Sequence, residues 1–211
     1  MPGECFVAGT LVATPAGSKP IEDIKLGERV LTPETKDGGA PQTGVDESTW
    51  RVFSLELQNP KANTNDEIEI KLLRPANWLE TEHSTNGTVE LNLNDIDLHG
   101  TAHLTGISQC PHIDSGSGRV VLMTITHRNN HVWNLTIEGE SQPIGVTDVH
   151  RMFSATRNGW VSACRLNVGE SLRSATETPT VISAAHMVGI FRVYNLEVER
   201  STAITFLRPR S

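Results

Sequence analysis

The chain has 211 residues, of which 37% are hydrophobic and 5% aromatic, and it carries a formal net charge of −7 with a sequence pI near 5.6. This length suits one large β domain or one domain with an insertion, while the acidic balance argues against nucleic acid or an anionic membrane as the main partner. No segment reaches 18 apolar residues, and the N-terminus has neither the basic nor the apolar region of a signal peptide.

The expected elements are short β-branched runs separated by proline, glycine and aspartate, which is typical of an all-β protein. The expected strands cover residues 5–14, 29–32, 51–57, 67–72, 88–93, 120–126 and 132–137. Residues 33–47 are expected to form an exposed loop, and residues 78–86 a short helix or an irregular connection. No long stretch has helical periodicity.

Two segments, residues 17–31 and 159–172, share a pattern. Each runs from a glycine turn through a short apolar run to Leu/Val-Gly-Glu and a strand. Two related β units suggest a pseudo-twofold arrangement, although Gly-Glu turns are common enough for chance to stay an alternative. Residues 35–144 have no counterpart and are interpreted as a largely β insertion. The domain would then be discontinuous, with an N-terminal part (1–34) and a C-terminal part (145–211).

The cysteines allow two interpretations of the start of the chain. The three cysteines, Cys5, Cys110 and Cys164, are an odd number, so one thiol must be free. A lone cysteine at the head of a strand is usually a small packed hydrophobe. Alternatively, Cys5 is a nucleophile that faces the Glu4–Cys5 peptide bond. That role requires a partner far away in sequence and near in space. Residues 1–4 would be either an artificial start or the remainder of a longer precursor.

Thr147 and His150 are candidates for that partner, because this spacing at a strand end can direct both polar side chains at one point. An ordinary polar turn that closes a strand has the same pattern. Histidine has an unperturbed pKa of about 6.5 and is the usual acid–base group near neutral pH.

Three blocks follow one another along the chain. They are Cys5-Phe6-Val7-Ala8-Gly9-Thr10-Leu11-Val12, Thr147-Asp148-Val149-His150 and Val193-Tyr194-Asn195-Leu196-Glu197-Val198. Together they resemble the Hint family, which includes inteins, hedgehog autoprocessing domains and bacterial intein-like domains. The resemblance covers roughly residues 3–32 and 145–207 and implies a Hint-type pseudo-twofold β horseshoe. The middle of the chain resembles the insertion of Hint domains carried by large bacterial Rhs-type or polymorphic-toxin proteins.

The resemblance implies a self-processing reaction. Cys5 would attack the carbonyl of Glu4 in an N–S acyl shift, and water or a small thiol or amine would then cleave the thioester and release the upstream polypeptide. His150 would protonate the departing amine, and Thr147 would orient the scissile peptide. The substrate would be the chain's own upstream segment in cis, so a monomer without a cofactor is expected.

The C-terminal end departs from the family pattern. Splicing inteins close with His-Asn, whereas this sequence offers no terminal asparagine, and Thr202 stands where a histidine is frequent. Asn195, a possible auxiliary residue, stands where many inteins carry aspartate. Cleavage without splicing is therefore expected. The alternative is a catalytically decayed Hint-like module that serves as a spacer or interaction domain. The localisation stays open between the bacterial cytoplasm and export within a larger protein.

The remaining cysteines and histidines carry weaker patterns. A metal cluster could be built from four of them, but their spacing fits no standard zinc pattern, so no metal is expected. Those four are Cys110, His112, His127 and His131. Cys164 is expected in the core. Four further histidines have no evident partner: His83, His99, His103 and His186.

Overall fold

The computed structural model describes residues 3–32, 43–58, 67–82, 84–93, 98–173 and 178–199. The strands are β1 (Phe6–Val7), β2 (Leu11–Thr14), β3 (Gly17–Pro20), β4 (Arg29–Val30), β5 (Trp50–Gln58), β6 (Glu67–Pro75), β7 (Ser84–Thr85), β8 (Thr88–Leu93), β9 (Leu98–Gln109), β10 (Arg119–Asn129), β11 (Val132–Ile137), β12 (Ile144–Thr147), β13 (Arg151–Ser154), β14 (Gly159–Ser162), β15 (Val181–Met187) and β16 (Phe191–Val198). The helical pieces are α1 (Trp78–Thr81) and the 3₁₀ turns η1 (Ile21–Asp23) and η4 (Ala163–Arg165). The predicted all-β fold is confirmed. In these ranges no helix is long and apolar enough to cross a membrane.

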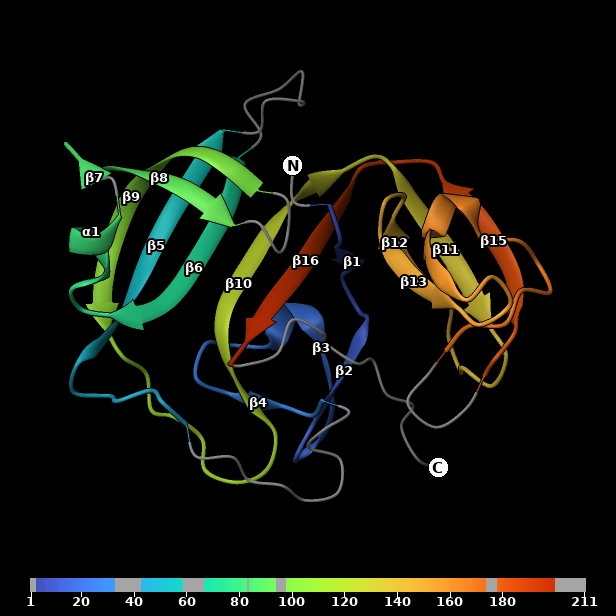
Figure 1. The fold of residues 1–211 in the computed structure, drawn as a ribbon, viewed down its shortest axis with the longest axis horizontal. Coiled ribbons are helices and arrows are strands. Elements are labelled where there is room, and N and C mark those ends of the chain that lie inside the picture. The colour runs from blue at the N-terminus through green and yellow to red at the C-terminus, as the bar shows by residue number, and fades with distance from the viewer. Residues whose placement is uncertain are drawn as a thin grey trace.

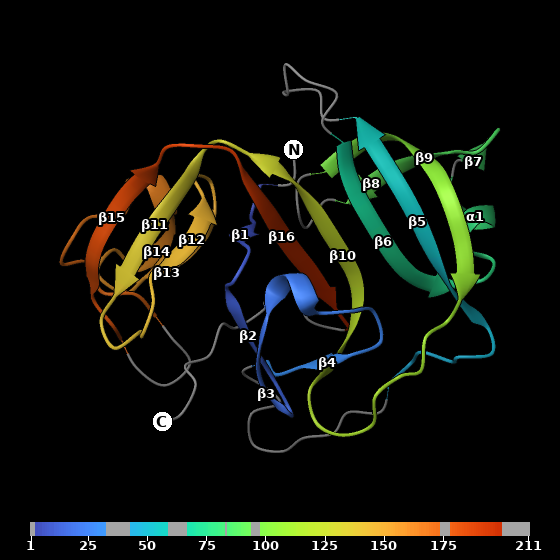
Figure 2. The same cartoon turned by 180° about the vertical axis from the view of Figure 1, so that it is seen from behind.

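Most of the described strands form one antiparallel sheet that runs the length of the molecule (Figure 1). The strand order is β15-β11-β12-β1-β16-β10-β6-β5-β9-β8-β7, and β4 pairs with β10 beside this path. Two separate hairpins, β2–β3 and β13–β14, accompany it. In the view from behind, β1 lies between β16 and β12, and it pairs with both strands (Figure 2).

The sheet order is symmetric about the β12–β1 pair, which confirms the pseudo-twofold prediction. Phe6 pairs with Val146 at this centre. On one side follow β16 and β10, and on the other side follow β11 and β15. β11 follows β10 in sequence but pairs with β12, and β16 follows β15 but pairs with β1 and β10. The two halves therefore exchange a strand, and each half contains a strand supplied by the other part of the chain.

The repeated sequence pattern forms a repeated piece of backbone. In both halves a hairpin leads into a 3₁₀ turn and then into a glycine in the left-handed region, Gly27 with φ 87° and Gly169 with φ 86°. The amide of Gly27 donates to the carbonyl of Val121 at 3.1 Å, and that of Gly169 donates to the carbonyl of Val181 at 2.8 Å. The positive φ explains the glycine at this point of each unit, because other residues adopt it at a cost.

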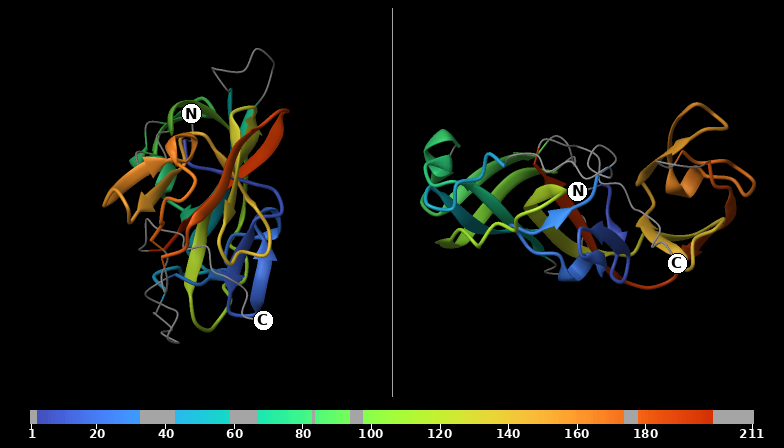
Figure 3. Two further views of the ribbon diagram at one scale, coloured as in Figure 1. Left: turned by 90° about the vertical axis from the view of Figure 1, so that its right-hand side faces the viewer. Right: turned by 90° about the horizontal axis from the view of Figure 1, so that it is seen from below.

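The boundary of the insertion differs from the predicted range 35–144. β10 and β11 fall inside that range, yet they pair with β16 and β12 in the central sheet. The part that projects as a lobe comprises β5 to β9, and β6 joins it to β10 (Figure 3). Alternation of apolar and polar residues is the same in a lobe strand and in a central strand, so the sequence alone cannot separate them.

Two apolar cores stabilise the two parts. The larger one lies in the pseudo-twofold body and includes Phe6, Leu135 and Leu196. The second one fills the lobe around Phe53 and Ile70, and α1 contributes partly buried side chains to it. A third, small cluster lies between β1, β11 and β16 and consists of Cys5, Val132 and Val193, with three partly buried neighbours, Val7, Met187 and Phe191.

Candidate functional site

Cys5 stands directly before β1 and is fully buried in this small cluster. Burial, and after it the negative charge of Glu4, raises the pKa of the Cys5 thiol far above its ordinary value. The side chain therefore exists as a protonated thiol and needs a nearby base to react. The side chain of Cys5 is surrounded by apolar residues, as the packing interpretation expects. That interpretation does not account for the polar side chain that binds its backbone.

Thr147, the last residue of β12, connects the two sides of Glu4. Its hydroxyl accepts a hydrogen bond from the amide of Cys5 at 3.0 Å and donates one to the carbonyl of Gly3 at 2.7 Å. The amide of Thr147 donates to the carbonyl of Cys5 at 3.0 Å. Because Thr147 is fully buried, water does not compete for these bonds. The peptide between Glu4 and Cys5 is thus held from a segment more than a hundred residues away.

His150 follows in the connection to β13. Its amide donates to the carbonyl of Thr147 at 3.0 Å, and its ring packs edge-on against Phe6 with 4.2 Å between the ring centroids. The buried Nδ1 has no hydrogen-bond partner within the described ranges. Burial, and after it the charge of Arg151, lowers the pKa of His150 to about 3, so the ring is neutral at neutral pH.

His127 on β10 is a neighbour of the thiol, although its sequence pattern suggests only a place in a hypothetical metal cluster. Its Nε2 lies 3.7 Å from Cys5 Sγ, and its Nδ1 lies 3.0 Å from the carbonyl oxygen of Arg128. A carbonyl oxygen only accepts, so this contact places the ring proton on Nδ1 and leaves Nε2 as an acceptor towards the S–H group. His127 is therefore arranged as a base beside the thiol.

Strand order explains this contact. Val193 of β16 pairs with Val7 on one side and with His127 on the other, so β1 and β10 flank the same strand. The only hint of this contact in the sequence is that His127 directly follows a long, mostly apolar run. The structure shows this ring to be almost wholly buried, as suits a polar group with a local partner.

Asn195 lies on β16, next to Tyr194, the residue that pairs with Phe6. It is buried, and its side-chain oxygen accepts a hydrogen bond from the amide of Leu196 at 2.7 Å. Its carboxamide is thus used by local backbone. The auxiliary role of Asn195 stays a prediction, and Thr202 lies outside the described residues.

The residues of the hypothetical metal cluster are not gathered in space. His112 pairs with Glu47 at 3.1 Å, whereas His127 contacts Cys5. Among the residues that the structure describes, no group of three histidines, cysteines or acidic residues could hold a metal ion. Cys110 and Cys164 are half-buried free thiols, so Cys164 is less enclosed than expected for a core residue.

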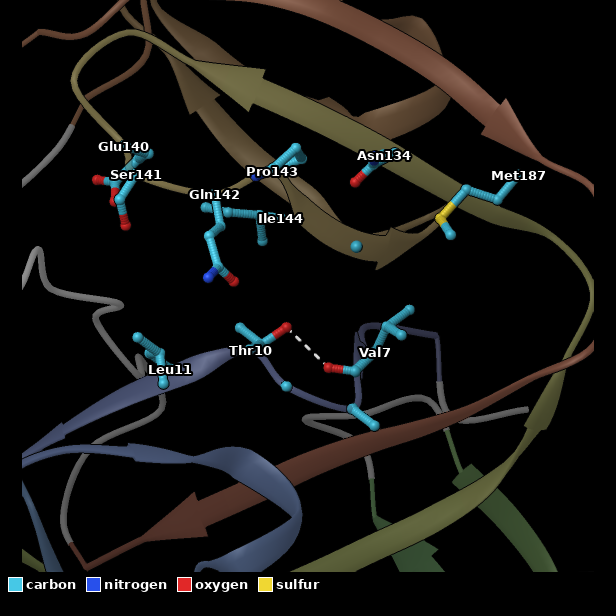
Figure 4. Close-up of a pocket in the computed structure, with 13 residues that line it drawn as sticks. Val7, Thr10, Leu11, Asn134, Glu140, Ser141, Gln142, Pro143, Ile144 and Met187 are labelled. Atoms are coloured by element: carbon cyan, nitrogen blue, oxygen red, sulfur yellow. Dashed lines mark hydrogen bonds between the residues drawn. The ribbon is translucent and has the colours of Figure 1, made fainter.

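A pocket of about 220 Å³ opens between β1 and the segment that leads into β12 (Figure 4). Thr10, Gln142 and Glu140 contribute polar groups to its wall, and the Thr10 hydroxyl donates to the carbonyl of Val7 at 2.8 Å. Val7 and Met187 line the pocket and also pack against the cluster that encloses Cys5. The wall of this hollow therefore shares side chains with the surroundings of the cluster that contains Cys5.

The buried neutral ring of His150 is expected to make the fold sensitive to acid. Between the ordinary pKa of 6.5 and the native value of about 3, the unfolded chain binds a proton that the native ring does not. The free energy of unfolding should therefore fall as the pH falls, by about 1.4 kcal/mol per pH unit from this group. Urea unfolding of the wild type and of His150→Phe at neutral pH and at about pH 4 measures the difference. An equal loss in both proteins would contradict the buried neutral ring.

No protein-family model and no curated protein matches the sequence. Among solved structures, a bacterial intein-like domain from Clostridium thermocellum is similar with a TM-score of 0.47 and 19% identity, over 93% of this chain and 87% of that one. The TvoVMA intein is similar with a TM-score of 0.48 and 15% identity, over 96% of this chain and 91% of that one. At these identities and TM-scores the likeness carries no argument about the site, whose chemistry has to be argued from its own residues.

Proposed function

We propose that this chain is a self-processing domain of the Hint type that cleaves its own Glu4–Cys5 bond and releases the upstream polypeptide. The observation that carries the proposal is the convergence of distant groups on one peptide. The hydroxyl of Thr147 bonds the amide nitrogen that would be released, and Nε2 of His127 faces the sulfur that would attack. A buried cysteine that only filled space would not need these partners.

The first step is the attack of Cys5 on the carbonyl carbon of Glu4. The S–H proton passes to Nε2 of His127 while the sulfur forms a bond to the carbon. Because the thiol is buried and its pKa is raised, a free thiolate would be costly, and the transfer has to accompany the attack. His127, held through its Nδ1, is positioned for this role.

The second step breaks the bond between the Glu4 carbon and the Cys5 nitrogen, and that nitrogen must gain a proton to leave as an amine. His150 is neutral at rest, so it must first take up a proton, either the thiol proton that His127 received in the first step or one from water. With a pKa of about 3 its protonated form is a strong acid, which suits transfer to a nitrogen that is barely basic. Thr147 keeps the nitrogen in place through its hydrogen bond. Water or a small thiol or amine then cleaves the thioester.

A second candidate is a decayed module that retains the fold without the reaction. The complete burial of Cys5 favours it, because a second nucleophile would have to reach the thioester carbon bonded to this enclosed sulfur. The two proposals differ in whether a carrier fused ahead of residue 3 is released. The expectation that cleavage proceeds without ligation rests on residues 201–211, which lie outside the described residues.

Replacing His127 by glutamine is expected to slow release of the carrier by about 10²–10⁴-fold, because the thiol loses its base. The deficit should narrow as the pH rises, since hydroxide can then remove the proton. Gel analysis of the fusion over a pH series, with and without hydroxylamine, measures both effects. His131→Gln is the matched control, because His131 is exposed in the next turn of the chain. An unchanged rate in His127→Gln would exclude His127 as the base.

A further inference from the structure

The residue before the candidate bond, Glu4, is held by its side chain as well as by its backbone. Thr147 bonds the carbonyl of Gly3 and the amide of Cys5, so one hydroxyl fixes the backbone on both sides of Glu4. The Glu4 carboxylate accepts a hydrogen bond from Nε of Arg151 and forms an ion pair with it. These three contacts fix both the backbone and the side-chain direction of Glu4. An ordinary segment that leads into a domain does not need such contacts.

Arg151 is placed by the same short segment that supplies Thr147 and His150. It is the first residue of β13 and follows His150 directly. The segment also covers Gly3, because a Cβ added there would lie 3.4 Å from the side chain of Val149. The stretch from Thr147 to Arg151 therefore forms a cradle over residues 3 to 5.

Charge explains why this position needs a cation. The carboxylate of Glu4 contributes to raising the pKa of the Cys5 thiol, so an uncompensated carboxylate here opposes the attack. Negative charge also develops on the Glu4 carbonyl oxygen during the attack. The guanidinium of Arg151 pairs with this carboxylate and so offsets its negative charge beside the Glu4–Cys5 bond.

We propose that Arg151 is a subsite for an acidic side chain at the residue immediately before the cleaved bond, and this rests on the proposed function. The domain accordingly prefers an upstream polypeptide that ends in glutamate over one that ends in a basic residue. A lysine or arginine at position 4 would face the guanidinium of Arg151 and displace the peptide from the cradle. Arg151 acts as a positioning residue, because it contacts the side chain and not the reacting atoms.

Both partners are partly exposed, with 59% of the Arg151 side chain and 30% of the Glu4 side chain accessible. Exposed ion pairs have moderate effects that salt weakens, so each charge reversal, Glu4→Arg or Arg151→Glu, should slow release of a fused carrier by about 3–10-fold at low salt. The double reversal should recover most of the rate, and the differences should shrink at about 0.5 M salt. Reversal of the similarly exposed pair Glu69 and Arg192 is the matched control and should leave the rate unchanged.

Additive losses in the double reversal would overturn the subsite, because a compensating pair must restore function. A second measurement does not depend on cleavage. In the non-cleaving variant Cys5→Ala, the Nε–H signal of Arg151 in a ¹⁵N-resolved NMR spectrum should shift and exchange faster with water after Glu4→Gln. An unaffected signal would also overturn the subsite. An uncleaved wild-type fusion would instead overturn the proposed function, and the NMR result would still decide whether Arg151 holds the acidic side chain.

Discussion

Replacement of Cys5 by alanine is expected to abolish release of a carrier fused ahead of residue 3, both in buffer and with added thiol or hydroxylamine. No thioester can form without the sulfur, and direct attack of hydroxylamine on an ordinary amide is very slow. The wild-type fusion should cleave slowly alone and faster with either reagent, because both cleave thioesters. Mass spectrometry of the released carrier should place the cut after Glu4.

Two matched variants make this result specific. Cys110→Ala and Cys164→Ala each remove a half-buried free thiol from elsewhere in the fold and should cleave at the wild-type rate. If Cys5→Ala cleaved as fast as the wild type, a contaminating protease or another group would be responsible. The reaction proposed here would then be wrong.

Removal of the His150 ring is expected to cause a loss of about 10²–10⁴-fold in the rate of release. The amine of Cys5 would then leave without its proton donor. Unlike the His127→Gln deficit, this one should not narrow as the pH rises, because protonation of a departing nitrogen becomes harder in alkaline solution. The same fusion assay over a pH series separates the two histidines.

A change in folding has to be distinguished from a change in chemistry, because the His150 ring also packs against Phe6. His150→Ala leaves a cavity there, whereas His150→Phe keeps an aromatic ring that cannot transfer a proton. Both variants should lose activity, and His150→Phe should unfold at the higher denaturant concentration. His186→Ala removes an exposed histidine on β15 and serves as a control. Substantial cleavage by His150→Phe would exclude His150 as the acid.

Much of the fold could be predicted, because its strands carry β-branched runs and its repeated glycine turns stand out. Two of the strands that were not predicted, β9 and β15, have different compositions. β9 contains two glycines and two histidines in twelve residues, and β15 carries two adjacent alanines and a histidine. Their strand character comes from pairing with β5 and β8 and with β11, which a local pattern does not reveal.

The candidate site could be predicted only where a family resemblance marked its residues. Cys5, Thr147 and His150 fall in the blocks that carry the resemblance, whereas His127 lies outside them. The protonation state of His150 could not be predicted from a sequence pattern either. Histidine is expected to titrate near pH 6.5, but the burial of His150 depends on where Phe6 and β13 lie, and this burial lowers its pKa to about 3.

If the proposed reaction takes place, the exchanged strand β16 determines how early during synthesis it can begin. Phe6 pairs with Tyr194, so the surroundings of Cys5 cannot assemble until almost the whole described chain has been made. At ordinary rates of translation the roughly 190 intervening residues take about 10–40 s, during which the upstream polypeptide is already free to fold. Under the proposed function, a ribosome stalled before β16 would therefore carry an uncut precursor, and any fused upstream protein would be released only after its own folding had had time to finish.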